Sequence, residues 1–138
     1  MTDLERLIGL ARIARAVFEQ VAMRDNWNPN LCGLCYDASC FLYRLAKREG
    51  IVTELGRGIG HWFVLFGDTV IDVTATQFEQ PERVMVTSLK QARSRGNWWH
   101  LCDRNPDPKP SVAWSDRLSN LAAEVEEGMG CGVGEGEL

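Results

Sequence analysis

The sequence predicts a single α+β domain over residues 1–127, and three patterns indicate this class. Apolar residues recur at helical spacing in the first part of the chain and again near its C-terminal end. Between these segments lie short strand-like runs, two of which are separated by a two-residue turn. Helices that are segregated from a small antiparallel sheet are typical of α+β proteins. A chain of 138 residues is also long enough to bury one hydrophobic core.

The first part of the chain predicts two helices joined by a loop. Residues 3–23 carry an apolar stripe, and Thr2 or Asp3 is expected to cap the helix. Residues 25–30 are rich in Asn and Asp and predict the loop. A second helix is expected from about Leu34 to Glu49, with Gly50 placed to end it.

The middle of the chain predicts a small antiparallel sheet. Glycines at Gly56–Gly60 predict a turn before the first strand. Residues 61–66 and 69–74 then form a hairpin, because Gly67-Asp68 suits a two-residue turn. A third strand is expected at residues 83–87.

Residues 88–110 show no clear pattern, although residues 105–110 indicate an extended, proline-stiffened connection. The C-terminal part predicts one helix at residues 115–127. Residues 128–138 are glycine-rich and acidic, which predicts a disordered tail.

Composition excludes several classes of protein. The net charge of −4, without basic runs, argues against a nucleic-acid partner. No apolar stretch approaches the roughly 20 residues that span a bilayer, so no membrane association is expected. Without a secretion signal, a cytoplasmic protein is expected, although signal-independent export to a host or target cell would leave the same sequence. The odd number of cysteines, five, favours free thiols. No cofactor or metal is expected, and the oligomeric state is left open.

Three residues predict a nucleophilic site: Cys35, His61 and Asp72. Cys35 falls in the first turn of the second helix, where the helix dipole and unpaired amide groups favour a thiolate. His61 begins a strand after a glycine. If the hairpin turn holds two residues, His61 and Asp72 share one face as diagonal neighbours, so the carboxylate can orient the imidazole.

Each residue of this triad also has a structural interpretation. A cysteine is commonly a small buried hydrophobe, and a histidine near a strand end is commonly structural. A carboxylate inside Val-Ile-Asp-Val requires a partner, which makes Asp72 harder to explain by packing alone. The combination of the three favours the catalytic interpretation.

Three motifs resemble small bacterial and phage enzymes with the papain-like or transglutaminase-like fold. Cys35-Tyr-Asp-Ala-Ser-Cys-Phe-Leu resembles their nucleophile helix, and Gly60-His-Trp-Phe-Val resembles their histidine strand. Ile71-Asp-Val-Thr-Ala-Thr-Gln-Phe is similar to their acid strand and is the most specific of the three. The resemblance covers about residues 30–87. It implies a nucleophile helix packed on a small antiparallel sheet, whereas the flanking N- and C-terminal helices are expected from apolar spacing alone.

The resemblance implies an acyl-transfer enzyme that attacks an amide bond of a protein or peptide through a thioester. Peptidase, isopeptidase, glutamine deamidase and transglutaminase activities are all compatible with it. The backbone N–H of Cys35 would help to hold the oxyanion. Asn28 and Asn30 are candidate side-chain donors, although turn formation around Pro29 is their commoner role. Trp62 is expected to shield the thiol or to line the substrate site.

Two alternatives are retained. A zinc site would use the pairs Cys32-x-x-Cys35 and His100-x-Cys102, although the second pair is too closely spaced for a standard knuckle. A non-catalytic binding or inhibitor protein on the same fold would use an aromatic surface. That surface would combine Trp62 with Trp98 and Trp99, which we expect first in the core.

The remaining cysteines fit the nucleophile role less well. Cys32 lies just before the helix, and Cys40 lies more than a turn into it. Neither has the spacing to the Ala-Ser pair that the resemblance implies, and Cys131 lies in the expected tail.

Overall fold

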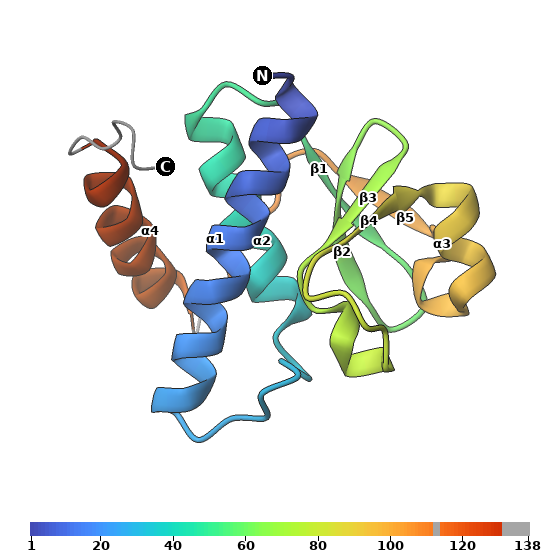
Figure 1. The fold of residues 1–138 in the computed structure, drawn as a ribbon, viewed down its shortest axis with the longest axis horizontal. Helices are drawn as coiled ribbons and strands as arrows, with labels where there is room; N and C mark the ends of the chain where they lie inside the picture. Colours follow the sequence, from blue (N-terminus) through green and yellow to red (C-terminus); the bar gives the residue numbers. More distant parts are fainter. Residues whose placement is uncertain (112–113, 131–138) are drawn as a thin grey trace.

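A five-stranded antiparallel sheet lies between a layer of long helices and a layer of short ones (Figure 1). The computed structural model describes residues 1–111 and 114–130. In chain order the elements are α1 (Asp3–Arg24), α2 (Cys35–Arg48), β1 (Glu54–Arg57), β2 (Trp62–Phe66), β3 (Thr69–Asp72), the 3-10 helix η1 (Ala75–Phe78), β4 (Met85–Ser88), α3 (Leu89–Arg95), the 3-10 helix η2 (Asn97–Trp99), β5 (Asp103–Asn105) and α4 (Ser115–Gly130). The α+β class is confirmed.

The ends of α1 and α2 follow the predicted capping signals. Thr2 Oγ1 accepts a hydrogen bond from Glu5 N at 3.1 Å, and Glu5 Oε1 accepts one from Thr2 N at 2.8 Å. This reciprocal pair satisfies two amide groups of the first turn. Helix α2 begins at Cys35, and Gly50 follows its C-cap with φ +74°. Glycine adopts that left-handed conformation without a steric penalty, which ends the helix there.

The sheet has the strand order β4-β3-β2-β1-β5. In the β2–β3 hairpin, Phe66 lies opposite Thr69 and Val64 lies opposite Ile71. This is the predicted register, in which Gly67 and Asp68 form the turn. Successive residues of each strand therefore point to opposite faces, and His61 and Asp72 lie on the same face.

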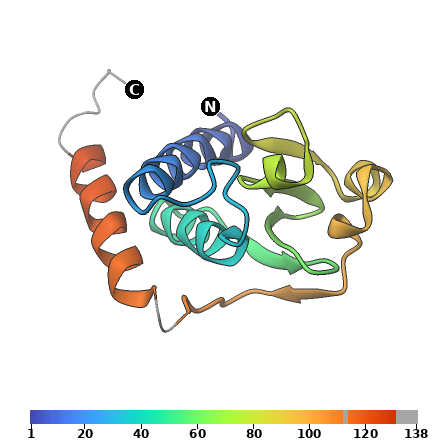
Figure 2. The same ribbon diagram turned by 90° about the horizontal axis from the view of Figure 1, so that it is seen from below.

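The two faces of the sheet contribute to two different apolar clusters. Helices α1 and α2 pack on one face, where Leu55, Val64 and Ile71 join a large apolar core. Helix α4 packs on α2, on the side away from the sheet, and extends that core. The other face is covered by α3 and η2 (Figures 1 and 2). There, Phe63 and Leu65 join a smaller cluster that contains Trp99.

Three expectations about element boundaries were wrong. Gly56, placed in a turn by composition, lies within strand β1. A Cβ at Gly56 would lie 2.6 Å from the Phe63 ring, so the glycine admits that ring rather than making a turn. The third strand begins at Met85 instead of residue 83. Helix α4 continues through Gly130, so residues 128–130 are helical, and the rest of the expected tail lies outside the described residues.

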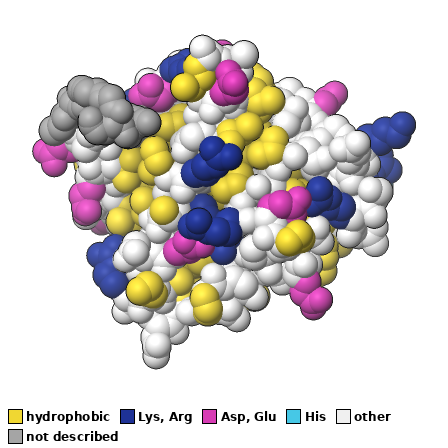
Figure 3. All heavy atoms as spheres, in the orientation of Figure 1, with side chains coloured by type: hydrophobic (Ala, Val, Ile, Leu, Met, Phe, Trp, Pro, Cys, Tyr) yellow, Lys and Arg dark blue, Asp and Glu magenta, His cyan; other side chains and the backbone are white. Residues whose placement is uncertain are grey.

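The segment without a clear pattern contains real elements, since α3, η2 and β5 all fall within residues 88–110. None of the described helices is long and apolar enough to cross a membrane. On the surface, basic and apolar side chains mix over α1 and the neighbouring edge of the sheet (Figure 3).

Candidate active site

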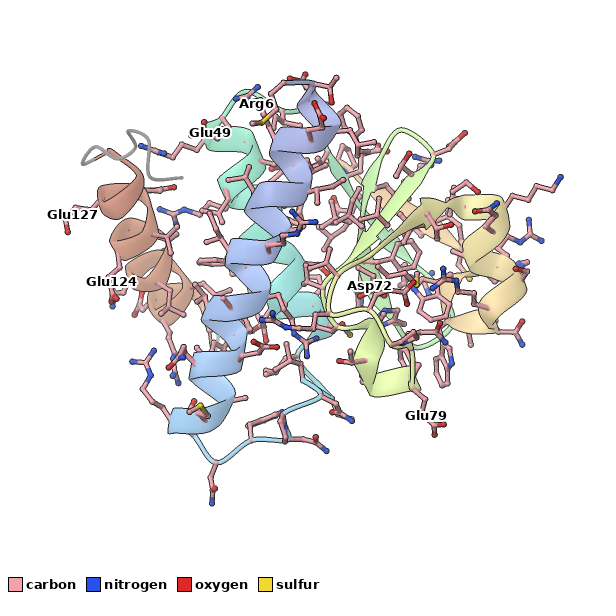
Figure 4. All side chains as sticks on the ribbon, viewed as in Figure 1. Arg6, Glu49, Asp72, Glu79, Glu124 and Glu127 are labelled. Atoms are coloured by element: carbon pink, nitrogen blue, oxygen red, sulfur yellow. The ribbon has the colours of Figure 1, made fainter. Side chains whose placement is uncertain are left out.

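His61 and Asp72 form a buried pair at the end of the β2–β3 hairpin. His61 precedes β2 and follows Gly60, whose φ is +70°, while Asp72 is the last residue of β3. His61 Nε2 lies 2.5 Å from Asp72 Oδ2, and each residue is 1% exposed. Asp72 lies between the sheet and the α3 layer (Figure 4). The hairpin register brings the two side chains together, as predicted.

Further donors hold the Asp72 carboxylate in place. Trp99 Nε1 donates to Oδ2 at 2.7 Å, and Thr74 N donates to Oδ1 at 2.9 Å. Thr74 Oγ1 lies 3.3 Å from Oδ1 and accepts a hydrogen bond from Gln77 Nε2 at 3.0 Å. A carboxylate buried this deeply would be costly without partners. These contacts satisfy both oxygens and fix the direction in which Asp72 faces His61.

The protonation of His61 is set by opposing influences. Burial disfavours the charged ring and is the largest single influence, but the charge and hydrogen bond of Asp72, with a further contribution from Cys35, outweigh it. Together they raise the pKa of His61 to about 9. The imidazole therefore carries a proton on both nitrogens at neutral pH. Its Nδ1 atom is buried and has no hydrogen-bond partner among the described residues.

Cys35 is the first residue of α2 and is partly buried. Its thiol is near enough to His61 to help raise the pKa of the ring, both through its charge and as a hydrogen-bond partner. The two groups do not come within hydrogen-bond distance and angle in this structure, so Nδ1 is left without a partner. Since Asp72 occupies Nε2, Nδ1 is the nitrogen available to the thiol. Leu34, at the N-cap, offers no side-chain hydrogen bond to the first turn, so the amide groups there remain available to a negative charge.

Aromatic rings enclose the imidazole on the side of the short helices. Phe78 meets His61 edge to face, with 4.7 Å between the ring centroids. The Phe78 ring also stacks on the Trp98 ring, with 4.1 Å between the ring centroids. Trp98 is 40% exposed, whereas Trp99 is fully buried. The expectation that both tryptophans lie in the core is therefore correct only for Trp99.

Trp62 lies beside the first turn of α2. Its ring packs edge to face on Tyr36, with 5.0 Å between centroids, and it is partly exposed. This position next to Cys35 is compatible with the predicted role in shielding the thiol or lining the substrate site.

Asn28 and Asn30 have turn-forming roles. Asn28 Oδ1 accepts a hydrogen bond from Asn30 N at 3.0 Å, and Asn30 Oδ1 accepts one from Cys32 N at 2.9 Å. Both contacts are local side-chain turns that shape the loop before α2. A role for either amide in holding an oxyanion stays a prediction.

The other described cysteines differ from Cys35. Burial raises the pKa of the Cys40 thiol to about 12, and Cys40 is only 5% exposed. A thiol in that environment is a poor nucleophile at neutral pH. Cys32 and Cys102 are exposed. Within residues 1–111 and 114–130, no three His, Cys, Asp or Glu side chains gather as metal ligands, so the zinc alternative gains no support.

Two residues of the site were not predicted from the sequence: Thr74 and Trp99 hold Asp72. Thr74 lies on the predicted shared face, but its local contact with the carboxylate depends on the turn after β3. Trp99 comes from a segment that showed no pattern. The available signal was chemical, since a buried indole N–H requires an acceptor and a buried carboxylate requires donors.

No family model matches the chain, and comparisons with curated proteins and with solved structures give no match either. The chemistry assigned to Cys35, His61 and Asp72 therefore rests on the geometry of these residues.

Proposed function

We propose that this protein is a thiol-dependent acyl-transfer enzyme that acts on an amide bond of a protein or peptide. In this proposal Cys35 is the nucleophile, His61 is the acid and base, and Asp72 orients His61. The scaffold is a papain-like arrangement, in which the helix that begins with the nucleophile packs on an antiparallel sheet. The reaction is hydrolysis, or transfer of the acyl group to an acceptor amine.

One observation carries the proposal. His61 is buried, its Nε2 is held by Asp72, and its Nδ1 has no partner while the Cys35 thiol lies nearby. A purely structural histidine in a buried site normally satisfies both nitrogens. An unsatisfied nitrogen beside a helix-start thiol is the arrangement that a proton transfer between the two requires.

The reaction begins from a resting pair in which the Cys35 proton is already on His61 Nδ1, so that the thiol is a thiolate and the ring an imidazolium. The thiolate attacks the carbonyl carbon, a C–S bond forms, and the carbonyl oxygen becomes an oxyanion. In this proposal the backbone N–H of Cys35, at the start of the helix, donates to that oxygen. His61 then gives its proton to the amide nitrogen as the C–N bond breaks, and a thioester remains on Cys35.

The thioester is resolved by water or by an amine. His61, now neutral, takes a proton from the attacking group, which forms the new bond to the carbonyl carbon. The C–S bond breaks, and the proton returns to the thiolate. Throughout, Asp72 stabilises the imidazolium and keeps its Nδ1 directed at the thiol.

The first test is the rate at which iodoacetamide modifies each cysteine between pH 5 and 9, measured by peptide mass spectrometry. Cys35 should react faster than exposed Cys102 at about pH 6, since a thiolate paired with an imidazolium persists below the normal thiol range. In His61→Gln the rate at Cys35 should fall by about 10²-fold at that pH. His100→Gln is the matched control, because His100 is exposed and should leave the rate unchanged.

The proposal fails if Cys35 is no more reactive than Cys102 in the wild-type protein at any pH in this range. A rate that is equal in wild type and His61→Gln would also contradict it, because the imidazole would then have no part in activating the thiol.

A further inference from the structure

A groove of about 620 Å³ separates helix α1 from the edge of the sheet, on the far side of β3 from the aromatic cluster around His61. Its apolar lining comes from both elements, and three arginines complete it. The apolar residues are Ile8, Pro81, Val84 and Val86, and the basic residues are Arg12, Arg15 and Arg83. The proposed chemistry of Cys35 uses none of them.

Strand β4 forms one wall of this groove and is an edge strand of the sheet. It pairs with β3 alone among the described residues, so its outer backbone edge has no strand partner there. Val86 lies opposite Ile71, a residue of the core beneath α1. Directly opposite residues share a face, so Val86 points toward α1 and into the groove. An unpaired edge next to an apolar groove is the arrangement that binds an extended peptide as an added strand.

The groove also has a surplus of positive charge. Arg15, which is 4% exposed, and Arg83 both pair with Glu19, so one carboxylate serves two guanidinium groups. Arg12 is exposed and has no ion-pair partner among the described residues. Glu82, the residue before Arg83 in the sequence, pairs with Arg95 and not with an arginine of the groove.

This positive surface belongs to a protein with a net charge of −4, so the field is local and not a property of the whole surface. Arg15 also donates to Val73 O and Thr76 Oγ1, each at 2.9 Å. Its guanidinium is therefore held in place by the fold, whereas Arg12 is free to meet a ligand. Figure 3 shows dark-blue basic side chains among yellow apolar ones over this part of the molecule.

We propose that this groove binds an extended acidic segment of a partner protein, which adds to the sheet as a strand beside β4. A carboxylate of that segment pairs with Arg12. The side chain two residues away lies on the same face of the added strand and is apolar, because it packs on Val86. The recognised chemistry is therefore an Asp or Glu two positions from an apolar residue. The site does not depend on the chemistry proposed for Cys35.

The probe is a displayed library of random seven-residue peptides, selected on the full-length protein and, in parallel, on its Arg12→Glu variant. Peptides enriched on the wild type should contain a carboxylate two positions from an apolar residue, and the variant should not enrich them. Arg93→Glu is the matched control, because Arg93 is exposed in α3 at a distance from the groove lining. It should enrich the same peptides as the wild type.

The leading peptide is then synthesised and its affinity is measured by fluorescence anisotropy. Its affinity should fall at least about tenfold for Arg12→Glu and remain unchanged for Arg93→Glu, as expected for loss of a charge-assisted contact. Alternate amides of an added strand point toward β4. N-methylation of that set should weaken binding by a similar factor, and N-methylation of the other set should not.

Three results would overturn the proposal. The first is the same set of enriched peptides on wild type and Arg12→Glu, or no enrichment on either. The second is an affinity that neither set of N-methyl groups changes, because the peptide would then not pair as a strand. The third is concentration-dependent dimerisation of the wild type, by analytical ultracentrifugation, that Arg12→Glu abolishes, since a second copy would then occupy the groove. Circular dichroism of both variants is the check that they are folded.

Discussion

The two faces of the sheet bury different kinds of side chain. Beneath α1 and α2, the buried residues are almost all apolar, with Leu42, Val64 and Ile71 fully buried. On the opposite face, the apolar cluster around Phe63 surrounds a buried hydrogen-bond network that joins His61, Asp72 and Trp99. Both faces exclude water, but only the second buries a carboxylate–imidazole pair, whereas the α1 side buries the guanidinium of Arg15 beside Glu19.

This difference separates stability from chemistry. Burial of apolar surface favours folding without further requirements, whereas a buried carboxylate and imidazole stabilise the fold only if their partners are complete. In this network every polar atom of Asp72 and Trp99 is satisfied, and the exception is His61 Nδ1. Thr53 Oγ1 is the other unpartnered buried side-chain atom among the described residues. The proposed reaction requires a ring nitrogen that no other group occupies, and His61 Nδ1 is that nitrogen.

The largest expected effect is on the apolar face. Leu42→Ala should lower the free energy of unfolding by about 2–5 kcal/mol, because it removes a fully buried side chain and leaves a cavity. Urea unfolding measures this change. Below the unfolding transition, the alkylation rate of Cys35 should stay within a factor of about two, since the hydrogen-bond network remains complete. A large loss of Cys35 reactivity in the folded variant would show that the two faces are not separable.

The next largest effect is a pH dependence of the free energy of unfolding, which arises from His61 on the polar face of the sheet. The folded-state pKa of His61 is about 9, above its ordinary value of 6.5, so the folded protein binds this proton more tightly than the unfolded chain. The resulting stabilisation is fully present below about pH 6.5 and is lost as the pH rises through about 9. It amounts to at most about 3 kcal/mol. Urea unfolding at pH 6, 7.5 and 9 measures it.

His61→Gln is the control for that titration. The part of the pH dependence between 6.5 and 9 should disappear in this variant, because glutamine does not titrate. If the dependence persists unchanged, another group carries it, and the account of the His61 pKa is wrong.

Trp99→Phe should have a smaller effect, and one that is specific to the polar face. It removes a donor from Asp72 Oδ2 while an aromatic ring still fills the site, so a loss of about 1–3 kcal/mol is expected. The alkylation rate of Cys35 at about pH 6 should fall severalfold, because a less constrained carboxylate orients His61 less well.

Trp98→Phe is the matched control for this change. Trp98 is partly exposed and stacks on Phe78, and phenylalanine keeps that stack. Its effect on stability should be below about 1 kcal/mol. If Trp98→Phe and Trp99→Phe lower the Cys35 rate equally, the hydrogen bond to Asp72 is not what matters.

The smallest effect should come from Cys40→Ala. Cys40 lies on the same helix as Cys35, but it is buried, and the pKa of its thiol is about 12. The variant should lose about 1 kcal/mol or less and keep the full alkylation rate at Cys35. Loss of the reactive thiol signal in Cys40→Ala would instead identify Cys40 as the nucleophile.

Most of the site was predictable because its parts are local. The position of Cys35 in the first turn of α2 follows from helical periodicity, and the end of the helix follows from Gly50. The shared face of His61 and Asp72 follows from a two-residue turn and the alternation of strands. By contrast, Gly56 was assigned to a turn from composition alone. Its role depends on the Phe63 ring that packs over it from the neighbouring strand.

The sequence by itself determined the α+β class, the helix that begins at Cys35 and the hairpin that pairs His61 with Asp72. The helix and the hairpin depend on residues that are close in the sequence, 11 positions apart for His61 and Asp72, where the helix and strand periods decide which side chains meet. Only the tertiary structure decided that Trp99, 27 residues after Asp72, completes the carboxylate's hydrogen bonds, and that Arg12 and Val86 line one groove. Such contacts depend on how whole elements pack, because side chains that are distant in sequence meet only after the sheet and helices are in place.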